Sequence, residues 1–149
     1  MTSKRESIMA SFATQLATIT VINGYNTTVV AVERWVTAPD LQDNDPADFP
    51  LVVLEEGDET IDYHPASMAM SSISFKIHAM LKGTTTVSPT TLNAFIEDVR
   101  QLVESNKTAG GNAIDVTVQS ITLQHHADIP YAVAVLDVST EYLHDVDTP

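Results

Sequence analysis

Hydrophobic and polar residues alternate over about ten residues of the segment 68–82. The apolar positions share one parity: Ile73, Phe75, Ile77, Ala79 and Leu81. The other parity carries Ser, Lys and His side chains. Because successive side chains of a strand point to opposite faces, this pattern predicts a strand with one buried face.

Two other segments repeat hydrophobic residues at helical spacing. The first covers residues 4–20 and follows Ser3 and Glu6, whose spacing is that of a capping box. The second covers residues 88–106 and begins with Ser88-Pro89, an N-cap followed by proline at the first helical position. Both segments are therefore predicted to be amphipathic helices.

Four further strands are predicted from β-branched and apolar runs, at residues 25–36, 51–54, 114–123 and 131–143. In the third of these the apolar parity changes partway along. A β-bulge near Gln119-Ser120 would reconcile the two halves. Residues 58–65 are interpreted as a turn region.

The elements follow one another as helix, three strands, helix and two strands. The links between consecutive strands are too short for helical crossovers. The sequence thus predicts an α+β fold, a mainly antiparallel five-stranded sheet with two helices packed on one face, in the order α-β-β-β-α-β-β. Residues 1–149 are interpreted as a single domain.

Three of the predicted strands are apolar on both parities, at residues 29–32, 51–54 and 132–136. Two helices cover only one face of a five-stranded sheet, so the second face needs another cover. We expect a neighbouring copy of the chain to supply it. The alternative is a strongly curled sheet that buries these residues against its own loops.

Composition excludes several classes of protein. The net charge of −13, from 7 basic and 20 acidic side chains, disfavours nucleic-acid binding through clustered Lys and Arg. No apolar run is long enough to span a membrane, and no membrane partner is expected. The chain has no cysteine, which excludes disulfides, thiolate metal sites and Cys nucleophiles.

Acidic residues gather in the middle of the chain, where no Lys or Arg occurs between Arg34 and Lys76. Nine acidic residues fall in this interval: Asp40, Asp43, Asp45, Asp48, Glu55, Glu56, Asp58, Glu59 and Asp62. They form either a solvated loop and hairpin, or a negative surface. Such a surface would meet a basic partner or line a pore through which DNA slips without sticking.

No residue pattern indicates catalysis. His125-His126 with Asp128 suggests a metal, but adjacent strand residues point to opposite faces and should not converge easily. Asp43-Asn44-Asp45 lacks the downstream glycine and glutamate of a calcium loop. The chain has no G-x-S-x-G, P-loop or G-x-G-x-x-G sequence. We therefore expect no enzyme activity, no metal and no cofactor.

The succession of elements resembles the tail terminator (tail-completion) proteins of long-tailed bacteriophages. The resemblance covers nearly the whole chain and rests on the first helix, Gly24-Tyr25-Asn26-Thr27-Thr28-Val29, Trp35, Phe49-Pro50-Leu51-Val52-Val53, Glu55-Glu56-Gly57, the alternating strand 71–82, the helix after Ser88-Pro89 and Thr140-Glu141-Tyr142.

This resemblance implies a structural virion protein, assembled in the host cytoplasm and placed at the junction of tail and neck. It implies a ring, typically a homohexamer, that caps the tail tube and joins it to the neck while DNA passes through the centre. The implied partners are further copies of the chain, the tail tube protein, a neck or connector protein and, without specific binding, genomic DNA. No catalytic position is implied.

Three aromatic residues near the loop-rich end, Trp35, Phe49 and Tyr63, are candidates for partner contacts, because aromatics are enriched in interface cores. Ordinary core packing is the alternative for each. Two other functions stay open: a neck or head-completion ring protein, and an acidic DNA mimic that inhibits a nucleic-acid-binding enzyme. A mimic needs its charge spread at phosphate-like spacing, whereas here nine of the 20 acids lie within residues 40–62.

Overall fold

The computed structural model describes residues 3–35, 49–64, 67–82, 88–125 and 131–145. The elements are α1 (Lys4–Leu16), β1 (Ala31–Trp35), β2 (Leu51–His64), β3 (Met68–Lys82), α2 (Pro89–Ser105), β4 (Asp115–His125) and β5 (Tyr131–Asp145). This order confirms the predicted α-β-β-β-α-β-β succession. Neither described helix is long and apolar enough to cross a membrane.

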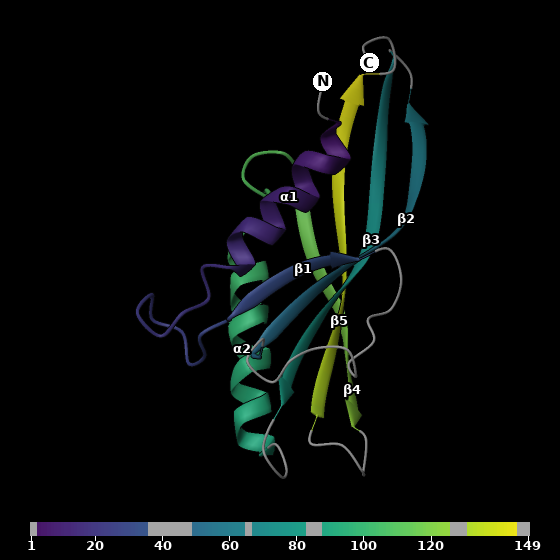
Figure 1. Ribbon diagram of the computed structural model, residues 1–149. Coiled ribbons are helices and arrows are strands. Elements are labelled where there is room, and N and C mark those ends of the chain that lie inside the picture. The colour runs from purple at the N-terminus through teal and green to yellow at the C-terminus, as the bar shows by residue number, and fades with distance from the viewer. Residues whose placement is uncertain (1–2, 36–48, 65–66, 83–87, 126–130, 146–149) are drawn as a thin grey trace.

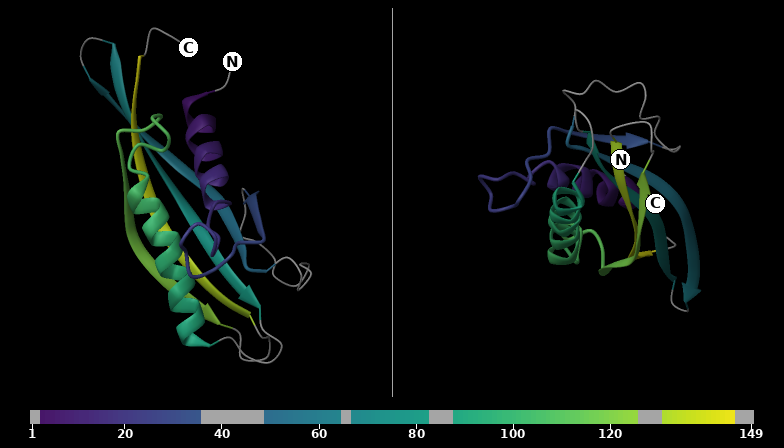
Figure 2. Two further views of the ribbon diagram at one scale, coloured as in Figure 1. Left: turned by 90° about the vertical axis from the view of Figure 1, so that its left-hand side faces the viewer. Right: turned by 90° about the horizontal axis from the view of Figure 1, so that it is seen from below.

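The five strands form one twisted sheet in the order β1-β2-β3-β5-β4 (Figure 1). Both helices lie against the same side of this sheet (Figure 2), which we call the helix face. The opposite side is called the far face. Cross-strand partners share a face, so the register assigns each strand residue to one side or the other.

The sheet is mixed, which corrects the prediction of a mainly antiparallel sheet. Three strand pairs are antiparallel, but β1 runs parallel to β2, with Ala31 opposite Leu51 and Trp35 opposite Glu55. Parallel neighbours need a connection of about a dozen residues or more, and the chain from 36 to 50 is long enough. The prediction had assumed that parallel strands need a helical connection, but a connection of this length does not have to be helical.

Two predicted strand lengths were wrong. The first strand, predicted over residues 25–36, begins only at Ala31 and is described as far as Trp35. The second does not stop at residue 54 but continues to His64. It passes residues 57–58 through a bulge, where Gly57 and Asp58 stand opposite the single residue Ser74.

Gly57 explains why the predicted turn is a continued strand. A Cβ atom at this position would collide with the backbone carbonyl of Ser74. Glycine therefore allows β2 to approach β3 closely at the bulge, and the two strands keep pairing to His64.

The remaining predicted elements agree well with the structure. The alternating strand 68–82 is β3, and the predicted bulge in β4 appears as a register shift between Val118 and Ser120. The side chains of Ser3 and Ser88 accept hydrogen bonds from backbone N–H groups and cap α1 and α2. Helix α1 ends at Leu16, four residues earlier than predicted.

The main core lies between the helices and the helix face. The largest buried side chains of this layer are Phe12 of α1, Phe75 of β3 and Phe95 of α2. The rings of Phe12 and Phe75 are 5.1 Å apart between centroids. Aromatic contacts of this kind fix how α1 sits on the sheet.

A second hydrophobic cluster occupies part of the far face. Its buried members are Phe49, Leu51, Val53, Met80, Val133 and Val135. These side chains are already buried within a single copy of the chain. The expectation that a neighbouring copy must cover this apolar surface was therefore wrong; the alternative of self-burial holds for these residues.

Asp98 fixes the chain that leads toward β1. It lies in α2 and is buried, and its carboxylate accepts hydrogen bonds from the backbone N–H of Asn26 (3.0 Å), the Asn26 side chain (3.0 Å) and the backbone N–H of Thr27 (2.8 Å). These bonds satisfy the backbone of residues 26–27 without a strand partner, which explains why β1 begins late.

Candidate functional site

The predicted acidic surface is divided by the structure. Asp40, Asp43, Asp45 and Asp48 lie outside the described residues. The other five carboxylates all belong to β2. Because β2 alternates and contains a bulge, these five residues are shared between the two faces of the sheet.

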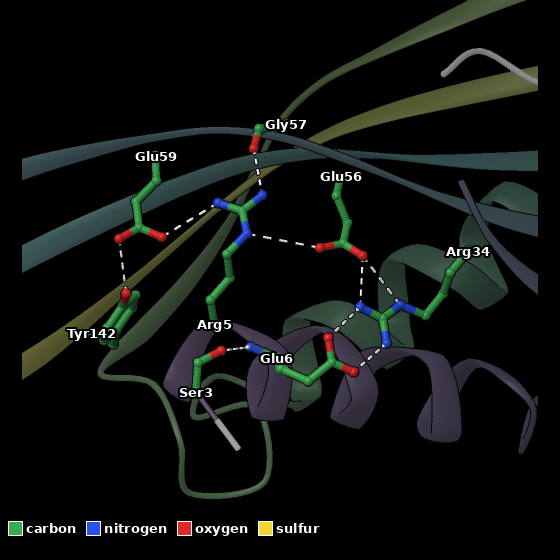
Figure 3. Close-up of polar contacts among 8 residues, drawn as sticks. All are labelled: Ser3, Arg5, Glu6, Arg34, Glu56, Gly57, Glu59 and Tyr142. Atoms are coloured by element: carbon green, nitrogen blue, oxygen red, sulfur yellow. Dashed lines mark hydrogen bonds and ion pairs between the residues drawn. The ribbon is translucent and has the colours of Figure 1, made fainter. Parts of the chain in front are cut away.

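Glu56 and Glu59 lie on the helix face, where arginines neutralise them (Figure 3). Arg5 of α1 contacts both carboxylates, at 3.8 Å from Glu56 and 3.3 Å from Glu59. It also donates a 2.6 Å hydrogen bond to the backbone carbonyl of Gly57. One guanidinium thus holds the start of α1 onto the bulge of β2.

Arg34 of β1 extends this network. Its two terminal nitrogens donate to the two oxygens of Glu6, at 2.7 and 2.9 Å, and it also contacts Glu56 at 2.6 Å. The hydrogen bonds from Arg34 lower the pKa of the Glu6 carboxyl, and Glu6 in turn raises the pKa of Arg34. The network joins α1, β1 and β2.

Tyr142 of β5 closes the network on its other side by donating a 2.8 Å hydrogen bond to Glu59. Burial raises the pKa of the Tyr142 hydroxyl, and the nearby Glu59 raises it further. Glu56 and Glu59 are therefore structural carboxylates, bound by groups of the same chain.

The far face carries the other described acids of the predicted surface, Glu55, Asp58 and Asp62. Three more acids join them that the sequence interpretation missed: Asp115, Asp137 and Glu141. They come from β4 and β5, far away in sequence, so only the strand register brings them to this face. No run of acidic residues marks them.

An open polar groove lies on this face between the bulges of β2 and β4. Its charged lining residues are Glu55, Asp58, Lys76 and Asp137. Glu55, Lys76 and Asp137 stand in one row across β2, β3 and β5. Lys76 is thus one cation among several carboxylates, and the face keeps an excess of negative charge.

His78 marks the boundary between this polar surface and the second hydrophobic cluster. It is buried between Val53 and Val135, and its Nε2 lies 3.5 Å from Glu55 without a hydrogen bond of good geometry. Burial lowers the pKa of His78, and the attraction of Glu55 only partly opposes this effect. The ring is therefore neutral at pH 7.

The candidate contact aromatics have different surroundings. Phe49 is buried in the second cluster, and Tyr63 is exposed near the end of β2. Trp35 ends β1, and its side chain lies outside the described part of the chain. Ile121 and Leu123 of β4 are exposed. The sequence interpretation placed them on a buried face, because a bulge before them brings them to the same side as Val116 and Val118.

The described residues contain no group of three or more His, Asp or Glu side chains arranged to hold a metal ion. What these residues form is a charged surface and a set of strand edges. A surface with this excess of carboxylates repels anions.

Replacing Arg5 with alanine tests the clamp on the β2 bulge. We expect Arg5→Ala to lower the free energy of unfolding by about 1–3 kcal/mol, because it leaves Glu59 and the Gly57 carbonyl without their charged donor. The measurement is urea unfolding. Arg100→Ala is the control, since Arg100 forms an exposed i,i+4 pair with Glu104 and should cost much less. Equal losses would contradict the clamp.

His78 should make stability fall as the pH drops below about 6.5. The unfolded chain then binds a proton that the buried ring refuses until the pH reaches its lower folded pKa. His78→Leu should remove a slope of at most about 1.4 kcal/mol per pH unit from urea unfolding between pH 7 and 5. Parallel profiles for His78→Leu and the unmodified chain would refute this role.

Comparison with known proteins agrees with this picture of a contact protein. A chain in the virion of a native gene transfer agent (GTA) particle has the same fold, with a TM-score of 0.61 over 97% of this chain and 100% of its own, at 12% sequence identity. No curated protein sequence matches significantly. Residues 2–147 match the family described as Bacteriophage Tail Tube Terminator Protein. The chain therefore belongs to the bacteriophage tail tube terminator family, as its resemblance had indicated, and is a structural protein of the phage tail.

Proposed function

We propose that this protein forms a ring that caps the end of the phage tail tube and joins it to the neck. The observation that carries the proposal is the family match, which spans residues 2–147. The ring stops further tube subunits from adding. Its function depends on contact surfaces, and no group of the protein needs to react.

Genomic DNA passes through the centre of this ring, and the far face of the sheet lines the passage. The carboxylates of this face support the assignment: Glu55, Asp58, Asp62, Asp115, Asp137 and Glu141. A negatively charged wall repels phosphates, so DNA moves along it without binding. The helix face is the wrong side for this role, because arginines already neutralise its carboxylates Glu56 and Glu59.

The partners in this arrangement are further copies of the chain, the tail tube protein and a neck or connector protein. The exposed Tyr63 is a contact residue toward one of them, since aromatic side chains contribute strongly to interface energy. Subunits assemble in the host cytoplasm and remain in the virion at the junction of tail and neck.

Electron microscopy of the purified protein mixed with tail tubes tests the capping function. We expect rings at one end of each tube and a tube length that stays constant when free tube subunits are added. The control is the same tubes without the protein, which should continue to lengthen. Uncapped tubes that lengthen equally in both samples would refute the proposal. Rings that bind only to the portal side of heads would favour a neck or head-completion protein.

Charge reversal tests which face lines the passage. Particles assembled with Asp62→Lys/Glu141→Lys should eject their DNA several-fold more slowly at low salt, because both exposed side chains lie on the far face. Glu97→Lys/Glu104→Lys makes the same change of charge on the exposed side of α2 and should eject at the normal rate. Equal rates for the two variants would show that the far face does not line the passage.

A further inference from the structure

The sheet leaves two long stretches of strand edge without a partner among the described strands. One is β4, the last strand of the sheet. The other is the second half of β2, because β1 pairs with β2 only from Leu51 to Glu55. The outer side of residues 56–64 is therefore open, and Figure 1 shows this part of β2 projecting past β1. Unpaired strand edges are templates for pairing with another chain.

Both open edges carry exposed apolar side chains on the same face of the sheet. On β2 they are Ile61 and Tyr63, which are 44% and 66% exposed. On β4 they are Ile121 and Leu123, which are 37% and 48% exposed. The strand register places all four on the helix face, beyond the area that the helices bury.

Both edges lack two of the usual protections against pairing. Residues 56–64 and 115–125 contain no proline and no lysine, the residues that commonly block edge strands. Among the described residues, Lys107 covers the beginning of β4 by donating a 2.9 Å hydrogen bond to the carbonyl of Val116. The stretch of β4 that follows, including Ile121 and Leu123, is open.

Charge determines which edge pairs with which. The open part of β2 carries two carboxylates that the arginines do not bind, Asp58 and Asp62, so two copies of this edge would repel each other. The open stretch of β4 after Val116 has no acidic residue. The acidic β2 edge therefore fits the uncharged β4 edge of a second copy better than it fits itself. A contact between two different surfaces of one chain produces rings or filaments.

We propose that residues 56–64 of one copy pair with β4 of the next copy, so that the sheet continues from subunit to subunit. The pairing is antiparallel, because β2 and β4 run in opposite directions within each chain. One register places Ile61 opposite Leu123 and Tyr63 opposite Ile121, which buries all four exposed side chains together. This inference rests on the proposed ring and names the surface that closes it.

The contact also requires neighbouring copies to be displaced along the strands. Within one chain, Ile61 shares a cross-strand row with Tyr142, next to the start of β4. Ile121 shares a different row, with Leu54. Bringing Ile61 and Tyr63 beside Leu123 and Ile121 therefore shifts each subunit relative to the last. A stagger of this kind accompanies the tilt of strands in any closed sheet.

Engineered disulfides test the register, and the absence of natural cysteine makes the result unambiguous. Ile61→Cys/Leu123→Cys should form a ladder of covalent oligomers up to the size of the ring on oxidation, and the ladder should collapse on reduction. Directly opposed residues of antiparallel strands are close enough for a disulfide. Ile61→Cys/Ile114→Cys is the control, because Ile114 is also exposed but lies out of register and should give at least ten-fold less product.

The single variants exclude other pairings. If Leu123→Cys alone or Ile61→Cys alone yields covalent dimers as efficiently as the double variant, each edge pairs with itself and the inference is wrong. A product that stops at dimers for the double variant would contradict head-to-tail assembly in the same way.

A second pair of variants measures the contribution of the apolar contact. Ile121→Lys/Leu123→Lys should weaken assembly at least ten-fold, measured by light scattering over a concentration series, with an unchanged circular dichroism spectrum. Val21→Lys/Ile22→Lys alters two exposed apolar residues away from both edges and should assemble normally. Rings that cap tubes but give no 61–123 disulfide would overturn this inference and leave the proposed function intact. The absence of rings in the unmodified protein would overturn both.

Discussion

The ion pairs and hydrogen bonds between α1 and the middle of β2 determine how the rest of the molecule is arranged. Arg5 binds two carboxylates and the Gly57 carbonyl at the point where β2 bulges, and Arg34 connects the same carboxylates to β1 and α1. Residues 51–54 of β2, before the bulge, are buried. After the bulge the strand projects past β1 (Figure 1). Buried and partly buried charges need partners. If α1 lay across the bulge of β2 in another orientation, carboxylates of β2 would lose their arginine partners.

The same strand separates two kinds of surface. Its helix-face carboxylates are bound internally, whereas its far-face carboxylates join acids of β4 and β5 around an open groove. The chain has seven basic and 20 acidic residues, and two of the basic residues, Arg5 and Arg34, bind carboxylates at the contact between α1 and β2. The carboxylates of β2 that no arginine binds therefore lie on the far face of the sheet. The proposed DNA passage rests on that asymmetry.

Local patterns predicted much of this fold. Strand 68–82, both N-caps and the bulge in β4 each leave a mark within a few consecutive residues, so they could be identified. The extension of β2 was missed because Gly57-Asp58 has the composition of a turn, and only the close approach to Ser74 explains the glycine. The parallel pairing of β1 and the partners of Glu56 and Glu59 depend on contacts between distant segments. The resemblance to tail terminators was confirmed, because it depended on the order of elements rather than on the direction of one strand.

Residues 51–54 take part in both hydrophobic clusters of the molecule. Val52 and Leu54 pack in the main core beneath the helices, and Leu51 and Val53 pack in the cluster on the other side. Four consecutive residues thus tie two layers to a single stretch of backbone. Neither layer can come apart without displacing this stretch and exposing the other, so the two unfold as one cooperative unit. Local opening is thereby directed to the projecting ends of β2 and β3, which can change conformation while the centre stays rigid.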